Sequence, residues 1–143
     1  MGNILDELSQ YARVRVKQDK KKMSLRRLKE ETDKLMSGGA SRESFKFENT
    51  LKKEGLSFIC EVKKASPSKG IIDPEFRYLD IAREYEAAGA DCISCLTEPK
   101  WFLGSDDIFR DIRAAVNTPM IRKDFTVDEY QIYQAKLMGA DAV

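Results

Sequence analysis

Histidine is absent from the 143 residues of this chain. Its absence excludes the Ser-His-Asp and Cys-His catalytic arrangements and removes the commonest ligand of zinc. Any acid–base chemistry must therefore use lysine, carboxylate, tyrosine or cysteine side chains. The chain also lacks an apolar run of about 18 residues, so we expect no transmembrane helix. Its formal net charge of +1 provides no global field for nucleic acid or a membrane surface.

Cysteine is scarce and odd in number, with only Cys60, Cys92 and Cys95 present. Such a count does not suggest a disulfide framework. Cys92 and Cys95 have the C-x-x-C spacing of some metal and redox sites, but they fall in a predicted strand, where a separation of three points them to opposite faces. We therefore predict that all three are small buried hydrophobic residues. The amino terminus lacks the layout of a secretory signal, and we expect a cytoplasmic protein.

The first 50 residues are predicted to be helical. Asn3 is the predicted N-cap of a first helix, and Ser24 is that of a second, which ends at a Gly-Gly pair. The three lysines at 20–22 are either a phosphate-binding patch or a solvated turn between these helices, and we favour the turn. Residues 44–53 have a mixed pattern from which no state is assigned.

From residue 57 onward, short apolar segments alternate with amphipathic ones. Strands are predicted at 57–63, 92–96 and 120–122, with a fourth beginning at 142–143. Helices are predicted at 79–88, from Ser105 to Val116, and after a capping box formed by Thr126 and Glu129.

A short repeat supports this alternation. Gly89-Ala90-Asp91 recurs as Gly139-Ala140-Asp141, each time between a helix end and a strand start. The offset fits two β/α units, which favours a parallel sheet. We predict an α/β protein, a partial (β/α)8 TIM barrel of about three and a half units. Residues 1–50 would be a helical amino-terminal extension and 51–143 the first half of the barrel. A doubly wound sheet is the alternative, although no G-x-G-x-x-G follows any strand.

The first predicted strand separates charged from apolar side chains. Glu61 and Lys63 share one face, whereas Phe58, Cys60 and Val62 form the other. In a barrel the charged face would line the interior, where an unpaired charge is costly. The two charged residues can pair there, and we favour a functional pair over a structural one on a solvated face.

Lys123 sits at the carboxyl end of the third predicted strand, where barrel enzymes carry out catalysis. Desolvated and crowded by Lys63, it would have a lowered pKa and could act as a general acid near neutral pH. A lone surface charge is the alternative. The loop at 66–70, Ser-Pro-Ser-Lys-Gly, is either an anion-binding turn or a plain exposed one. Trp101, Phe102 and Phe125 are either substrate-lining or core aromatics.

Three ordered segments resemble those of the indole-3-glycerol phosphate synthase family. They are Glu61-Val62-Lys63-Lys64-Ala65-Ser66-Pro67-Ser68; Leu96-Thr97-Glu98 with Lys100-Trp101-Phe102-Leu103-Gly104-Ser105; and Arg122-Lys123-Asp124-Phe125 with Tyr130-Gln131-Ile132. The resemblance covers about residues 57–143, and the helical residues 1–50 match only in kind, as the family's amino-terminal extension.

The resemblance implies a lyase of tryptophan biosynthesis that closes an indole ring from 1-(2-carboxyphenylamino)-1-deoxyribulose 5-phosphate, losing CO2 and water, without a cofactor. Lys123 matches the general acid, Lys63 a lysine that binds the substrate's anionic groups, and Glu61 the carboxylate that orients them. Ser66 matches a contact to the anthranilate carboxylate. The residues that match the family's walls around the aromatic ring of the substrate are Leu96, Phe102 and Phe125.

The family's second catalytic carboxylate and its phosphate-binding loops have no counterpart in residues 1–143. We therefore expect the chain alone to be inactive or nearly so, and its open sheet edges to pair into a homo-oligomer, by exchange of elements if domain-swapped. Two rivals are another phosphate-substrate barrel enzyme, such as an isomerase, which the two lysines disfavour, and a non-catalytic self-associating half-barrel module.

Overall fold

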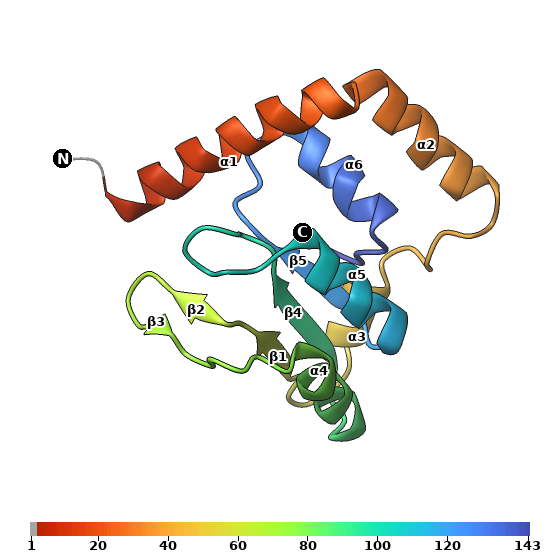
Figure 1. Ribbon diagram of the computed structural model, residues 1–143. Coiled ribbons are helices and arrows are strands. Elements are labelled where there is room, and N and C mark those ends of the chain that lie inside the picture. The colour runs from red at the N-terminus through yellow and green to blue at the C-terminus, as the bar shows by residue number, and fades with distance from the viewer. Residues whose placement is uncertain (1–2) are drawn as a thin grey trace. The chain divides into compact units, whose positions relative to one another are not determined.

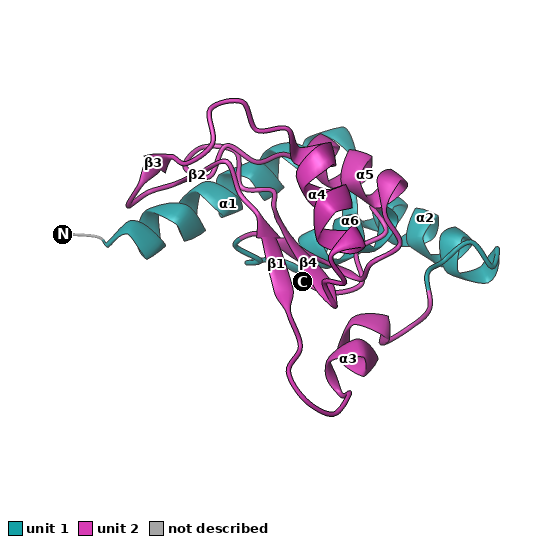
Figure 2. Cartoon of the chain, turned by 90° about the horizontal axis from the view of Figure 1, so that it is seen from below, with its two compact units in different colours: residues 1–42, 125–137 teal, residues 43–124, 138–143 magenta. Residues whose placement is uncertain are grey.

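The computed structural model describes residues 3–143. Their contacts divide the chain into two units, residues 1–42 with 125–137 and residues 43–124 with 138–143 (Figure 2). The predicted division between an extension and a barrel half at residue 50 stays a prediction. No helix among residues 3–143 is long and apolar enough to cross a membrane.

The first unit contains three helices, α1 (Ile4–Lys22), α2 (Leu25–Ser37) and α6 (Glu129–Leu137). Both predicted N-caps are confirmed, because the Asn3 side chain accepts from the Asp6 N–H and that of Ser24 from the Arg27 N–H. Local signals within one helical turn therefore set where these helices begin.

Tyr130 of α6 joins the three helices. It is buried with Val16 and Leu28, and its hydroxyl donates to the backbone oxygens of Met23, at 2.8 Å, and Asp19, at 3.1 Å. Met23 is the C-cap of α1, and Asp19, whose carbonyl also accepts from the Met23 N–H, lies in the last turn of that helix. The contact thus satisfies a helix end while burying an aromatic ring.

Two predictions in this unit need correction. The N-cap of α6 is not Thr126, because the helix begins at Glu129 and the carboxylate of Asp128 accepts from the Tyr130 N–H at 2.8 Å. The lysines at 20–22 form the last turn of α1 rather than a turn between helices, and Lys20 pairs with Asp128 at 2.7 Å.

The second unit is built on a parallel sheet in the order β1-β4-β5. Its strands and helices, in chain order, are α3 (Lys46–Leu51), β1 (Ile59–Val62), β2 (Ala65–Ser66), β3 (Gly70–Ile71), α4 (Tyr78–Ala87), β4 (Cys92–Leu96), α5 (Asp106–Ala115) and β5 (Met120–Lys123). Helices α4 and α5 lie side by side against one face of the sheet (Figure 1).

This alternation of strand and helix is the repeating pattern of a (β/α)8 barrel, as predicted. The predicted central strand is confirmed at both ends, and strand one is shorter than predicted. Ala142 makes a parallel bridge to Ile121, which confirms the predicted start of a fourth strand. The segment left unassigned at 44–53 contains α3, and Phe45 precedes it in a left-handed conformation.

The repeated Gly-Ala-Asp motif has the same local role at both occurrences. Gly89 and Gly139 have φ values of 84° and 81°, which end the preceding helices. Asp91 then accepts from the Phe58 N–H and Asp141 from the Met120 N–H, both at 2.8 Å. Each aspartate therefore ties the start of its own strand to the start of the neighbouring one.

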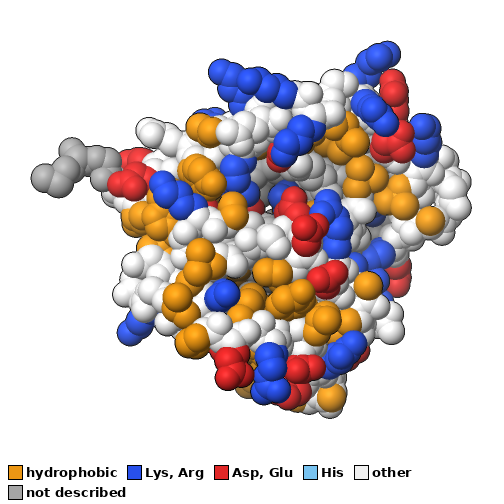
Figure 3. Space-filling view, viewed as in Figure 1, with side chains coloured by type: hydrophobic (Ala, Val, Ile, Leu, Met, Phe, Trp, Pro, Cys, Tyr) orange, Lys and Arg blue, Asp and Glu red, His pale blue; other side chains and the backbone are white. Residues whose placement is uncertain are grey.

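The segment after β1 is not a plain loop, because β2 and β3 pair as an antiparallel hairpin. Gly70, at φ 65°, permits its tight turn. Exposed apolar residues of this region are Phe58, Ile59, Ile71 and Ile72. Apolar side chains reach the surface over the hairpin and β1 (Figure 3).

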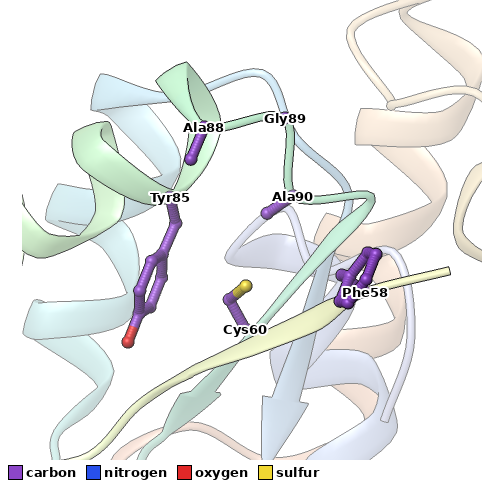
Figure 4. Close-up of a pocket in the computed structure, with 6 residues that line it drawn as sticks. All are labelled: Phe58, Cys60, Tyr85, Ala88, Gly89 and Ala90. Atoms are coloured by element: carbon purple, nitrogen blue, oxygen red, sulfur yellow. The ribbon is translucent and has the colours of Figure 1, made fainter.

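The cysteines are free, but only two are buried as predicted. Burial raises the pKa of Cys92 to about 11 and that of Cys95 to about 12. Cys60 is half-buried, because it lies in a pocket of about 280 Å³ between β1 and α4. The thiol is flanked there by Tyr85 and Phe58 (Figure 4).

Candidate active site

Two rows of side chains cross the sheet on the face opposite α4 and α5. Paired residues of parallel strands point to the same side. The register therefore puts Glu61, Ser94 and Ile121 in one row. The next row lies nearer the carboxyl ends of the strands. It contains Leu96, its register partner Lys123, and Lys63, which directly follows the last paired residue of β1.

The predicted ion pair on β1 is confirmed. The Lys63 ammonium lies 2.8 Å from Oε1 of Glu61, and the Ser94 hydroxyl donates to Oε2 at 3.2 Å. Both side chains keep about a third of their surface exposed, at 32% and 35%. A pair this exposed contributes only about 0–1 kcal/mol to stability. Stability alone is therefore a weak reason for its presence.

Lys123 lies at the carboxyl end of β5, as predicted, but it is exposed. The expected desolvation of this lysine is therefore wrong. Lys63 directly follows β1 and Lys123 ends β5, the strands on either side of β4, so their Cα atoms are about 10 Å apart. The two lysines lie on either side of Leu96, and crowding of Lys123 by Lys63 stays a prediction.

Neighbouring residues fix the backbone that carries Lys123. Arg122 points to the helix side and pairs with Asp106 of α5 at 2.9 Å, with only 4% of its surface exposed. On the carboxyl side, the Thr97 hydroxyl donates to Asp124 at 2.6 Å, and the Thr97 N–H donates to the Lys123 oxygen at 3.0 Å. These contacts on either side of Lys123 therefore fix the backbone from which its side chain extends.

The predicted substrate contacts are distributed over both units. Ser66 is part of the hairpin, where its Oγ accepts from the Lys69 N–H at 3.3 Å. Leu96 is buried at the end of β4, and Phe102 is half-buried in the loop that follows. Phe125 belongs to the first unit, and the second unit contains the other predicted site residues.

Sequence reasoning gave no role to Glu98, which is fully buried two residues after β4. Its carboxylate accepts from three successive backbone N–H groups, those of Lys100, Trp101 and Phe102. The only signal in the sequence is an acidic residue two positions after an apolar strand, a pattern that does not by itself separate burial from exposure.

The family model described as indole-3-glycerol phosphate synthase matches residues 5–143. The chain is 51% identical over 140 residues to the indole-3-glycerol phosphate synthase of Ruminiclostridium cellulolyticum, which covers 98% of this chain and 52% of that protein.

Two further enzymes of that name are similar. That of Endomicrobium trichonymphae is 48% identical over 140 residues, covering 98% of this chain and 53% of its own length. That of Lachnoclostridium phytofermentans is 42% identical over 147 residues, covering 98% and 54%. The chain thus spans about half the length of the curated relatives it matches.

Proposed function

The chain belongs to the indole-3-glycerol phosphate synthase family, and we propose that it supplies the first half of such an active site. The proposed reaction closes the indole ring of 1-(2-carboxyphenylamino)-1-deoxyribulose 5-phosphate, with loss of CO2 and water. The observation that carries the proposal is the Glu61–Lys63 ion pair one strand away from Leu96, with Lys123 on its other side.

In this proposal Lys123 is the general acid. A bond forms between the ring carbon bearing the carboxylate and the ketone carbon, while the ketone oxygen takes a proton from the ammonium of Lys123. Loss of CO2 returns its bonding electrons to the ring and restores its aromaticity, and loss of water then forms the double bond that completes the indole. The exposed position of Lys123 leaves its ammonium accessible to a substrate at the strand ends.

Lys63 and Glu61 would hold and orient the substrate beside that acid. The ammonium of Lys63 can bind an anionic group and assist the dehydration, and Glu61 fixes it through the 2.8 Å ion pair. Ser66 would donate to the anthranilate carboxylate. Leu96, Phe102 and Phe125 would form the walls around the ring.

The 143-residue chain alone is proposed to turn over little or no substrate, because its relatives are about twice as long. The remaining catalytic carboxylate and the phosphate-binding loops would come from the other half of such a protein. We place the protein in the cytoplasm, where the free thiols of its three cysteines fit a reducing environment.

We also propose that the chain self-associates. Among residues 3–143, β1 pairs only with β4, so its other edge has no strand partner. Phe58, directly before β1, is 62% exposed. Pairing of two β1 edges, or exchange of elements between copies, would cover this surface.

The deciding test is the fluorescence assay for indole-3-glycerol phosphate. It is run on the chain with and without a separately made carboxyl-terminal half of the Ruminiclostridium relative. We expect activity only in the mixture, with Lys123→Ala lowering kcat roughly 100-fold or more. Lys52→Ala, at an exposed lysine of α3 paired with Glu48, is the control and should change little. Activity in neither case would favour the non-catalytic self-associating module.

A further inference from the structure

The carboxylate of Glu98 organises the loop between β4 and α5. Oε1 accepts from the Lys100 N–H at 2.9 Å, and Oε2 accepts from those of Trp101 and Phe102 at 2.8 and 2.9 Å. The side chain is 0% exposed. Three converging backbone donors compensate the charge of a carboxylate that solvent does not reach.

The same loop is closed a second time by its own backbone. The Gly104 N–H donates to the Glu98 oxygen at 2.9 Å. A Cβ atom at Gly104 would lie 2.2 Å from the carbonyl oxygen of Leu96, so only glycine fits this approach. Leu103, before it, adopts a φ of 53°, a conformation unfavourable for a side chain and held by these contacts.

These contacts determine where Phe102 lies. Its backbone is bound through Glu98 to the end of β4, two residues past Leu96, and Leu96 is the register partner of Lys123. Glu98 therefore sets the position of the Phe102 backbone relative to the carboxyl end of the sheet. Glu98 is fully buried and cannot itself touch a substrate.

We propose that Glu98 is a positioning residue, which holds Phe102 at the strand ends so that its ring can pack against the aromatic ring of the substrate. The proposal rests on the proposed function for the identity of that ring. Its effect would be on substrate binding, because Glu98 acts through the backbone and transfers no proton. Loss of the carboxylate should then raise KM while leaving kcat nearly unchanged.

Glu86 provides a matched control in the same unit. Its Oε1 accepts from the N–H groups of Asn117 and Thr118, at 2.6 and 2.8 Å, and from the Thr118 hydroxyl at 2.9 Å. These residues precede β5, at the amino end of the sheet. Glu86 and Glu98 are thus both carboxylates that accept from backbone N–H groups, at opposite ends of the strands. If Glu98 had a purely structural role, replacing either residue by glutamine should have similar consequences.

The first experiment uses Trp101, the single tryptophan of the chain, as a reporter within the loop. Acrylamide quenching of its fluorescence is compared in the wild type, Glu98→Gln and Glu86→Gln, with circular dichroism to confirm folding. We expect the quenching constant to rise about twofold or more in Glu98→Gln only, because the amide keeps one acceptor but turns a donor toward the backbone N–H groups. Equal quenching in all three would overturn the proposal.

Should Glu98→Gln fail to fold, Glu98→Asp takes its place, since it keeps the charge but cannot reach all three donors. In the active mixture with the second half, kcat/KM of the Glu98 variant should fall roughly 10-fold to 100-fold, mostly through KM. A fall confined to kcat, or an equal fall in Glu86→Gln, would contradict positioning. A wild-type mixture without activity would refute the proposed function, while the quenching comparison would still decide whether Glu98 orders the loop.

Discussion

At the scale of single residues, the burial of a side chain decides its chemistry in this protein more than its type does. The three thiols illustrate this. Cys92 and Cys95 lie in the central strand and are fully buried, whereas Cys60, on the neighbouring strand, opens into a pocket. The thiolate is the reactive form of cysteine, and burial disfavours it.

This difference predicts selective modification of one cysteine. With Ellman's reagent at pH 8, we expect one fast thiol per native chain, Cys60, and slow reaction of the other two. Burial raises the pKa of Cys92 to about 11 and that of Cys95, with a contribution from Asp106, to about 12, so both stay protonated at this pH. Cys60→Ser should remove the fast phase, and guanidinium should expose all three thiols. Two fast thiols in the native protein would contradict the assignment.

At the scale of elements, strand starts are tied together by acidic side chains. Asp91 pairs with Lys53 and accepts from the Phe58 N–H, joining the start of β4 to that of β1. The hydrogen bond from Lys53, together with that from Phe58, holds the pKa of Asp91 below its usual value of 3.8. A carboxylate with a lowered folded-state pKa stabilises the fold above its unfolded value and loses that contribution as the pH falls.

Asp91→Asn should therefore lower the melting temperature by several degrees at pH 7. The difference from wild type should persist down to about pH 4 and shrink below it, as the wild-type carboxylate becomes protonated. Thermal melts between pH 3 and pH 7 would test this. Asp107→Asn, at a side chain 90% exposed, is the control and should alter the melting temperature little at any pH. A difference in melting temperature that grew as the pH fell would contradict the predicted loss of stabilisation by Asp91 at low pH.

At the scale of the whole molecule, an unpaired strand edge bears on assembly. Phe58 directly precedes β1, whose outer edge has no strand partner among residues 3–143, whereas Phe45, before α3, is equally apolar and 70% exposed but lies outside the sheet. We expect a dimer or larger species at micromolar concentration by light scattering. Phe58→Lys should shift it to monomer because a lysine blocks edge pairing. Phe45→Lys should leave it unchanged, and a wild-type monomer would count against self-association.

Much of this fold was predictable because its signals are local. Asn3, Ser24 and Ser105 cap their helices within one turn, and the apolar run at β4 matches its strand at both ends. The cap of α6 was predicted wrongly at Thr126, because two acceptors lay within three residues and only the path of the chain selects Asp128.

The sequence by itself determined the family, the strand–helix alternation and the residues that carry the proposed chemistry, since each depends on residue type and spacing along the chain. The tertiary structure alone decided which of them meet. Ser94 reaches Glu61 from another strand, Lys123 is exposed, and Glu98 is buried within a loop that folds back on it. Burial and pairing depend on neighbours distant in sequence, and no local pattern specifies those neighbours.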